Sequence, residues 1–166
     1  MRNTDESTGP HSVLILTDIS ATESFGRKLG SLLFPHSVIA LDGQLGAGKT
    51  YLCRAIAEGL EVRNPAAVNS PTFVLIQEYA ARLPIFHFDA YRLSGPQEFF
   101  ELGVEEYFAA GGVCLIEWAE RVRPALPDER LDVQIRVLSE TSRSLEFTAH
   151  GERHKSFLQS LLVDRD

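Results

Sequence analysis

The chain has few lysines and no long apolar stretch. Only three of its 166 residues are lysine, and no apolar run approaches the roughly 18 residues that a membrane-spanning helix needs. The formal net charge of −7 at pH 7 argues against a broad grip on a nucleic-acid backbone, because clustered lysine and arginine supply that grip. We therefore expect no membrane association and no direct sequence-specific binding of nucleic acid.

The N-terminal segment is also poor in apolar residues. Residues 1–11 are polar and have no apolar core of the kind found in signal peptides. We expect this segment to be mobile and the protein to be cytoplasmic. The length of the remainder, residues 12–166, suits a single domain, and it contains no repeat, linker or low-complexity segment.

Cysteine is scarce as well, with two residues in the chain. Cys53 lies in an apolar helical segment and Cys114 in an apolar run, and neither has the sequence neighbours of a metal site. Disulfides are rare in the cytoplasm. Both residues are therefore interpreted as small members of the core.

One segment indicates a ligand class. Residues 43–50, Gly-Gln-Leu-Gly-Ala-Gly-Lys-Thr, fit the phosphate-binding loop, and they lie between an apolar strand at 38–41 and a helix predicted at 49–60. Glycines let successive N–H groups point at phosphate oxygens, and the positive end of the helix adds to that field. Lys49 would reach the β- and γ-phosphates, and the Thr50 hydroxyl would bind Mg²⁺. The residues expected to bind the nucleotide are Gly43, Leu45, Gly46, Ala47, Gly48, Lys49, Thr50 and Tyr51.

The remaining patterns predict an α/β fold. A helix is expected at 20–33, where Ser20 and Glu23 have the spacing of a capping box, although segment 18–22 could instead border the nucleotide base. Alternating and apolar runs predict strands, with hairpins between neighbouring pairs, and a C-terminal amphipathic helix is expected at 152–162. The expected strands are 12–17, 38–41, 72–79, 85–88, 113–116, 131–138 and 145–149. Together they predict a P-loop NTPase-like three-layer sandwich with a mainly parallel central sheet and antiparallel hairpin strands.

Two strand ends offer carboxylates to a metal. Glu117 follows the apolar run 113–116, and Asp89 follows 85–88, so both side chains should emerge at the carboxyl edge of the sheet where ligands gather. Glu117 could instead cap the helix that starts near Trp118, and Asp89 could pair with Arg92 at a turn. His87, between two phenylalanines, is interpreted as a packed strand residue in preference to a catalytic base.

Two further residues have open interpretations. Thr72 follows Ser70-Pro71, at a place where many nucleotide hydrolases sense the γ-phosphate, but Pro71 could equally make a rigid start to a strand. Trp118 is either a core residue or an exposed anchor for a partner, because tryptophan concentrates at binding hot spots.

Four motifs in this order resemble the TsaE family, formerly called YjeE. They are Gly-Gln-Leu-Gly-Ala-Gly-Lys-Thr at 43–50, Val-Asn-Ser-Pro-Thr-Phe at 68–73, His-Phe-Asp-Ala-Tyr-Arg-Leu at 87–93 and Leu-Ile-Glu-Trp at 115–118. The phosphate loop alone is shared by many families, whereas the four motifs together are specific. The resemblance extends from about residue 22 to the strand at 131.

The resemblance implies a small bacterial ATPase that is needed for threonylcarbamoyladenosine modification of tRNA. Such a protein binds ATP and Mg²⁺ and works with the TsaB and TsaD subunits, of which TsaD carries the transfer chemistry, and it meets tRNA only indirectly through the complex. ATP hydrolysis would reset the transferase between turnovers. Gln44 stands where the family commonly has Asp, and Tyr51 stands where Thr or Ser is usual. Both departures leave the Gly-Lys-Thr core intact and put fine features such as the basal rate in question.

Residue roles follow from the same resemblance. Trp118 would contact TsaD, and Thr72 would lie in the nucleotide-sensing segment. The expected catalytic residues are Lys49, Thr72, Asp89 and Glu117, and the expected metal ligands are Thr50, Asp89 and Glu117.

Other classes of nucleotide-binding protein compete with this interpretation. A small-molecule kinase has similar glycine spacing but usually closes a basic lid over its phosphates, and nothing between Arg54 and Ala110 resembles one. A GTP switch would need Asn-Lys-x-Asp, which is absent. A nucleotide-dependent adaptor with negligible hydrolysis is the non-enzymatic alternative.

Overall fold

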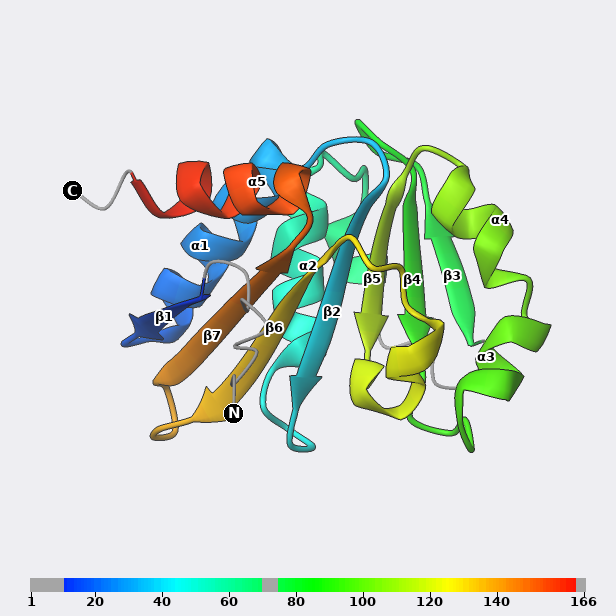
Figure 1. Ribbon diagram of the computed structural model, residues 1–166. Coiled ribbons are helices and arrows are strands. Elements are labelled where there is room, and N and C mark those ends of the chain that lie inside the picture. Colours follow the sequence, from blue (N-terminus) through cyan, green and yellow to red (C-terminus); the bar gives the residue numbers. More distant parts are fainter. Residues whose placement is uncertain (1–10, 70–74, 164–166) are drawn as a thin grey trace, which may run out of the picture.

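The computed structural model describes residues 11–69 and 75–163, in which seven strands form one sheet (Figure 1). The strands are β1 (His11–Leu16), β2 (Ser37–Gly43), β3 (Ile76–Tyr79), β4 (Ile85–Asp89), β5 (Val113–Glu117), β6 (Arg130–Val137) and β7 (Arg143–His150). The α-helices are α1 (Ile19–Leu32), α2 (Lys49–Gly59), α3 (Pro96–Glu101), α4 (Val104–Ala109) and α5 (Glu152–Val163), with 3-10 helices η1 (Pro65–Ala67) and η2 (Ala119–Ala125). The predicted mobile segment lies outside the described residues except for His11, which opens β1.

The sheet is mixed, in the order β1-β7-β6-β2-β5-β4-β3. The four central strands, β6, β2, β5 and β4, are parallel, and β7, β1 and β3 add antiparallel pairs at the two ends. The expected parallel centre and hairpins are therefore present, although antiparallel pairs are as numerous as parallel ones in the described part. Strands β2 and β5 are buried along almost their whole length because helices cover both faces, and residues 38–41 and 113–116 within them are accordingly continuous apolar runs.

Helices pack on both faces of this sheet and form two cores. One core joins α1, α2 and α5 to the sheet through residues such as Leu29, Ile56 and Phe157. The other joins α3, α4 and η2 to the opposite face through Phe99 and Val122. Figure 1 shows α3, α4 and η2 gathered around the β5-β4-β3 end of the sheet. No helix in the described ranges combines the length and apolar character needed to cross a membrane.

The start of α1 differs from its prediction. Asp18, not Ser20, is the N-cap: its backbone is extended, and its carboxylate accepts a hydrogen bond from the N–H of Ala21 at 2.7 Å. Glu23, expected as the second half of a capping box, instead accepts a hydrogen bond from the hydroxyl of Tyr51 on α2. The Glu23 side chain thus makes a contact between helices in place of the predicted cap.

Glycines allow α1 to lie directly against α2, the helix that begins at the glycine-rich loop. A Cβ atom on Gly30 would lie 2.1 Å from the carbonyl oxygen of Ile56, and one on Gly59 would lie 2.1 Å from that of Arg27. Both distances are far below van der Waals contact, so any larger residue must push the helix backbones apart. The close packing of α1 against α2 therefore depends on these two glycines.

Gly30→Ala should lower the free energy of unfolding by about 1–3 kcal/mol, because it overpacks this contact. Helix propensity alone would give the opposite sign, since alanine is favoured over glycine by about 1 kcal/mol in a helix. Urea unfolding followed by circular dichroism measures the change. Ser24→Ala, on the exposed side of α1, is the control and should shift stability by no more than about 0.5 kcal/mol. A Gly30→Ala variant as stable as this control would show that the helices are not in close contact.

His154 joins α5 to the central strand β2. Its ring is 2% exposed, and its Nε2 atom accepts a hydrogen bond from the N–H of Val38 at 3.2 Å. Burial lowers the pKa of His154 to about 4, and the charges of Arg153 and His150 act in the same direction. The fold therefore requires the neutral imidazole at this position.

Protonation of His154 should make stability fall as the pH drops. Above pH 6.5 the imidazole is neutral in the folded and in the unfolded protein. Between pH 6.5 and about pH 4 the unfolded chain binds a proton at His154, whereas the folded chain does not. At pH 5 this difference amounts to about 2 kcal/mol of lost stability. Denaturant unfolding of the wild type and His154→Gln between pH 7 and 5 measures it. Parallel curves for the two proteins would contradict the prediction, because glutamine can accept the Val38 bond without titrating.

Candidate functional site

The glycine-rich loop connects β2 to α2 and needs its glycines. Gly46 and Gly48 have φ angles of +80° and +105°, in the left-handed region that other residues rarely adopt. Gly43 approaches β6 closely, because a Cβ atom there would lie 2.8 Å from the carbonyl oxygen of Ile135. The loop therefore curls at the amino end of α2, where free N–H groups and the helix dipole favour an anion.

Lys49 folds back over this loop. Its Nζ atom donates hydrogen bonds to the carbonyl oxygens of Gly43 at 2.6 Å and Gln44 at 2.9 Å. The same atom lies 3.9 Å from the centre of the Trp118 ring, within range of a cation–π interaction. Burial lowers the pKa of Lys49, while Glu117 is the first of the nearby carboxylates that oppose the shift. The lysine is thus a poorly solvated cation that a phosphate could attract away from these weak acceptors.

Glu117 and Asp89 lie side by side, as their strand-end positions predicted. β4 and β5 are parallel with Asp89 paired to Glu117, and both residues are buried. The Glu117 carboxylate accepts one hydrogen bond from the Thr50 hydroxyl at 2.9 Å, and its other oxygen lies 2.6 Å from Nε2 of His87. Asp89 accepts a hydrogen bond from the N–H of Tyr91 at 2.8 Å. Oxygen atoms of Asp89 at the end of β4, Glu117 at the end of β5 and Thr50 at the start of α2 therefore lie in one site.

The alternative role of Glu117 as a helix cap is not what the structure shows. The short helix η2 has Trp118 at its N-cap without a side-chain cap bond, and the Glu120 N–H donates instead to Asp42 at 2.8 Å. Asp42 also pairs with Arg123, so it anchors both ends of η2 to the strand before the loop. Sequence reasoning missed Asp42, because its partners lie about 80 residues away along the chain.

A cavity of about 380 Å³ brings the predicted residues together. Its walls are Leu45, Gly46, Gly48, Lys49, Thr50, Tyr51, Asp89, Tyr91, Glu117 and Trp118. Trp118 is partly buried and packs against Tyr91, with ring centres 4.8 Å apart and planes tilted by 49°, so it is part of the wall and keeps some exposed surface. Thr72 belongs to segment 70–74, which lies outside the described residues.

A second cavity of about 170 Å³ lies on the other side of Gly48 and Tyr51, which line both cavities. Its lining is mostly apolar and includes Ile19 and Thr22, from the segment 18–22 that was considered as a border for the base. It also includes Arg143, whose Nε atom donates to the loop carbonyl of Ala47 at 2.9 Å. No sequence signal pointed to Arg143, because β7 and the loop meet only in the folded sheet.

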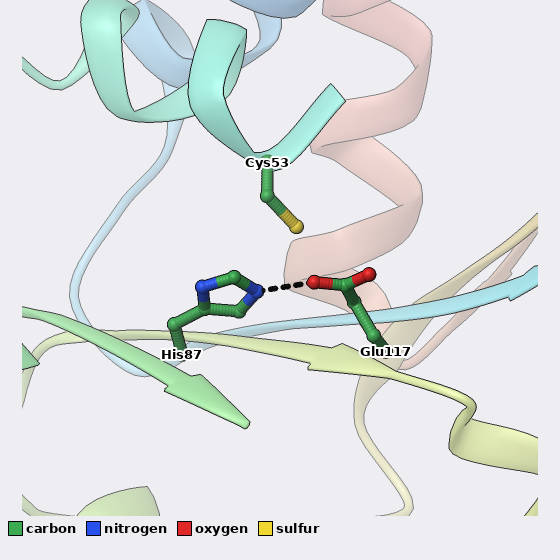
Figure 2. Close-up of side chains that lie close together, drawn as sticks. All are labelled: Cys53, His87 and Glu117. Atoms are coloured by element: carbon green, nitrogen blue, oxygen red, sulfur yellow. Dashed lines mark hydrogen bonds and ion pairs between the residues drawn. The ribbon is translucent and has the colours of Figure 1, made fainter. Parts of the chain in front are cut away.

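His87 is packed, as predicted, but its ring also contacts the site. It is fully buried in β4, and its Nε2 atom faces the Glu117 carboxylate (Figure 2). The sequence interpretation treated packing and a role at the site as alternatives, whereas this ring combines both. Its inward direction follows from strand alternation, but its contact with Glu117 depends on the parallel register of β4 and β5.

Fold and site together define an α/β protein in which a glycine-rich loop, a lysine and a threonine face two buried carboxylates. The family model "Threonylcarbamoyl adenosine biosynthesis protein TsaE" matches residues 16–145, which is more than half of the chain. The chain therefore belongs to the TsaE family, as its motifs predicted.

Individual relatives agree with this assignment. The tRNA threonylcarbamoyladenosine biosynthesis protein TsaE of Bacillus subtilis is 40% identical over 141 residues, covering 84% of this chain and 87% of that protein. The protein of the same name from Treponema pallidum is 40% identical over 124 residues, covering 75% of this chain and 90% of its own. A crystal structure of YdiB from Bacillus subtilis superposes with a TM-score of 0.77 and 32% identity over 92% of this chain and 95% of that one.

Proposed function

We propose that this protein is a Mg²⁺-dependent ATPase that acts in threonylcarbamoyladenosine modification of tRNA, together with TsaB and TsaD. The observation that carries the proposal is the convergence of Lys49 and Thr50 with Glu117 and Asp89 around one cavity, in a chain of the TsaE family. In this view the described part is a single P-loop NTPase-like domain of three layers. A role in tRNA modification also implies a cytoplasmic location.

The phosphates of ATP suit the larger cavity. Gly46 and Gly48 line it in the left-handed conformation, and the amino end of α2 adds a positive field. Lys49 would exchange the carbonyls of Gly43 and Gln44 for phosphate oxygens, which are stronger acceptors because they are charged. Tyr51, which lines both cavities, would then separate the phosphates from a base in the smaller, more apolar one.

The oxygen donors suit Mg²⁺. Thr50 supplies a neutral hydroxyl, and Glu117 and Asp89 supply carboxylates, which together match the preference of a small hard cation for oxygen ligands and retained waters. The cation would also offset the repulsion between the two adjacent carboxylates. When bound, Mg²⁺ neutralises phosphate charge, and the carboxylate that does not contact it directly can orient the attacking water.

The composition of this cavity supports the proposal that the isolated protein hydrolyses ATP slowly. Of the described residues that line it, Lys49 is the one with a positive charge, and none is an arginine. Phosphoryl transfer commonly relies on an arginine to stabilise charge in the transition state, and a partner can supply it. We propose that TsaB and TsaD raise the rate, that Trp118 contacts TsaD through its exposed surface, and that hydrolysis resets the transferase while tRNA is held by the complex.

Lys49→Ala should abolish the contribution of this protein to tRNA modification, because it removes the cation that the phosphates require. The test is reconstituted formation of threonylcarbamoyladenosine with TsaB and TsaD, with and without this chain, alongside ATP consumption. Lys155→Ala, on α5 away from the cavity, is the matched control and should behave as wild type. ATP use that followed phosphorylation of a metabolite and ignored TsaB and TsaD would instead establish a kinase.

Glu117→Gln should lower the rate of ATP hydrolysis by about 100-fold or more, since it removes a charge that acts on the metal and phosphates. Glutamine keeps the volume and an acceptor for His87, so the fold and much of the nucleotide affinity should survive. Hydrolysis should be measured over a range of Mg²⁺ concentrations, and fluorescent-nucleotide binding in parallel. Glu120→Gln, an exposed neighbour, is the control. A rate close to wild type would remove Glu117 from the mechanism.

A further inference from the structure

Three side chains with different donor atoms converge beneath the loop helix. Cys53 points from α2 toward His87 on β4 and Glu117 on β5, and one donor atom of each lies within 4.8 Å of the others (Figure 2). All three residues are buried: the His87 side chain is 0% exposed and that of Glu117 is 3% exposed. The sequence assigned Cys53 to the core because its histidine and carboxylate neighbours lie 34 and 64 positions further along the chain.

The chemistry of this cluster differs from that of the proposed magnesium site. Mg²⁺ selects oxygen ligands, whereas sulfur, imidazole nitrogen and carboxylate oxygen together form a donor set of Zn²⁺ and related borderline cations. Three protein ligands leave a fourth position for water, as in exchangeable zinc sites. The donors also come from three different elements, so the parallel sheet and α2 hold their backbones in place.

We propose that Cys53, His87 and Glu117 form a binding site for a single thiophilic divalent cation, with Zn²⁺ as the physiological candidate, and that its occupation inhibits the protein. Zn²⁺ would lie between His87 Nε2 and the Glu117 carboxylate, where the hydrogen bond now runs, with the Cys53 sulfur as third ligand. The 2.6 Å separation of nitrogen and oxygen must widen to about 3.3 Å, the distance between two ligands of a tetrahedral zinc ion.

Proton movements limit how tightly the cation binds. Cys53 releases its thiol proton to solvent as sulfur binds the metal, and the imidazole proton moves from Nε2 to Nδ1. Nδ1 of His87 is buried and has no hydrogen-bond partner in the described part of the chain, so this proton is poorly accommodated. Zinc ligands usually have such a partner for the second nitrogen. The site is therefore expected to bind an exchangeable cation and not a permanent structural one.

Glu117 links this site to the loop. It is the one member of the cluster among the described residues that line the larger cavity, and it accepts a hydrogen bond from Thr50. A carboxylate drawn toward Cys53 and His87 is withdrawn from Thr50 and from Mg²⁺. Inhibition by this competition rests on the proposed ATPase function, whereas binding of the cation does not.

Titration of the nucleotide-free protein with Co²⁺ tests binding directly, because a cobalt–thiolate bond produces a charge-transfer absorption band. The wild type should show this band with one equivalent bound, and Zn²⁺ should abolish it by displacement. Cys53→Ser should lose the band, and His87→Gln should lower the affinity by at least about tenfold. Cys114→Ser is the matched control, because Cys114 is equally buried on β5 but belongs to no such cluster among the described residues.

The outcomes separate the site from the proposed function. A band that survives in Cys53→Ser, or no band in the wild type at saturating Co²⁺, overturns the site and leaves a hydrogen-bonded core cluster. His87→Gln retains the thiol, so it decides the question if Cys53→Ser does not fold. Zn²⁺ should inhibit ATP hydrolysis of the wild type and Cys114→Ser but not of Cys53→Ser, and equal inhibition of all three overturns the competition. Absence of hydrolysis in the wild type and every variant, with TsaB and TsaD present, would refute the ATPase function, while the cobalt spectrum still decides the site.

Discussion

The buried carboxylate of Glu117 is the constraint on which the site depends. An anion removed from water is tolerated only when hydrogen bonds or opposite charges surround it. Here the Thr50 hydroxyl bonds one oxygen, the His87 ring faces the other, and Lys49 contributes a positive charge nearby. These three groups come from the loop helix and a neighbouring strand. The single carboxylate therefore ties α2, β4 and β5 together at the edge of the sheet where the loop opens.

A second layer of contacts holds the loop from outside. Arg143 on β7 bonds the loop carbonyl of Ala47, and Asp42 on β2 bonds η2, the segment that follows Glu117 and Trp118. Arg143 and Asp42 both lie far along the chain from the residues that they bond. Because each bond joins elements that are distant in sequence, these contacts form only when β7 and η2 have packed beside the loop. This dependence couples the stability of the fold to the geometry of the site.

Much of the fold and of the site was predictable, and for physical reasons. The continuous apolar runs of β2 and β5 reflect burial on both faces, and the alternation of β6 and β7 reflects a hairpin, so these elements were found where expected. The strand-loop-helix pattern at 43–50 and the acids at two strand ends placed the candidate site at one edge. The cap of α1 was wrong because Glu23 bonds Tyr51 across the helix interface, a contact that local spacing does not encode.

The sequence by itself determined the phosphate-loop pattern, the strand ends that carry Asp89 and Glu117, and membership of the TsaE family, because each depends on short motifs and on their order along the chain. Only the tertiary structure decided that His87 faces Glu117, that Cys53 completes a cluster with both, and that Lys49 lies under Trp118. These contacts depend on the register of parallel strands and on the position of α2 over them. Packing brings residues that are far apart in the chain into contact, and the spacing of residues within a motif does not predict such contacts.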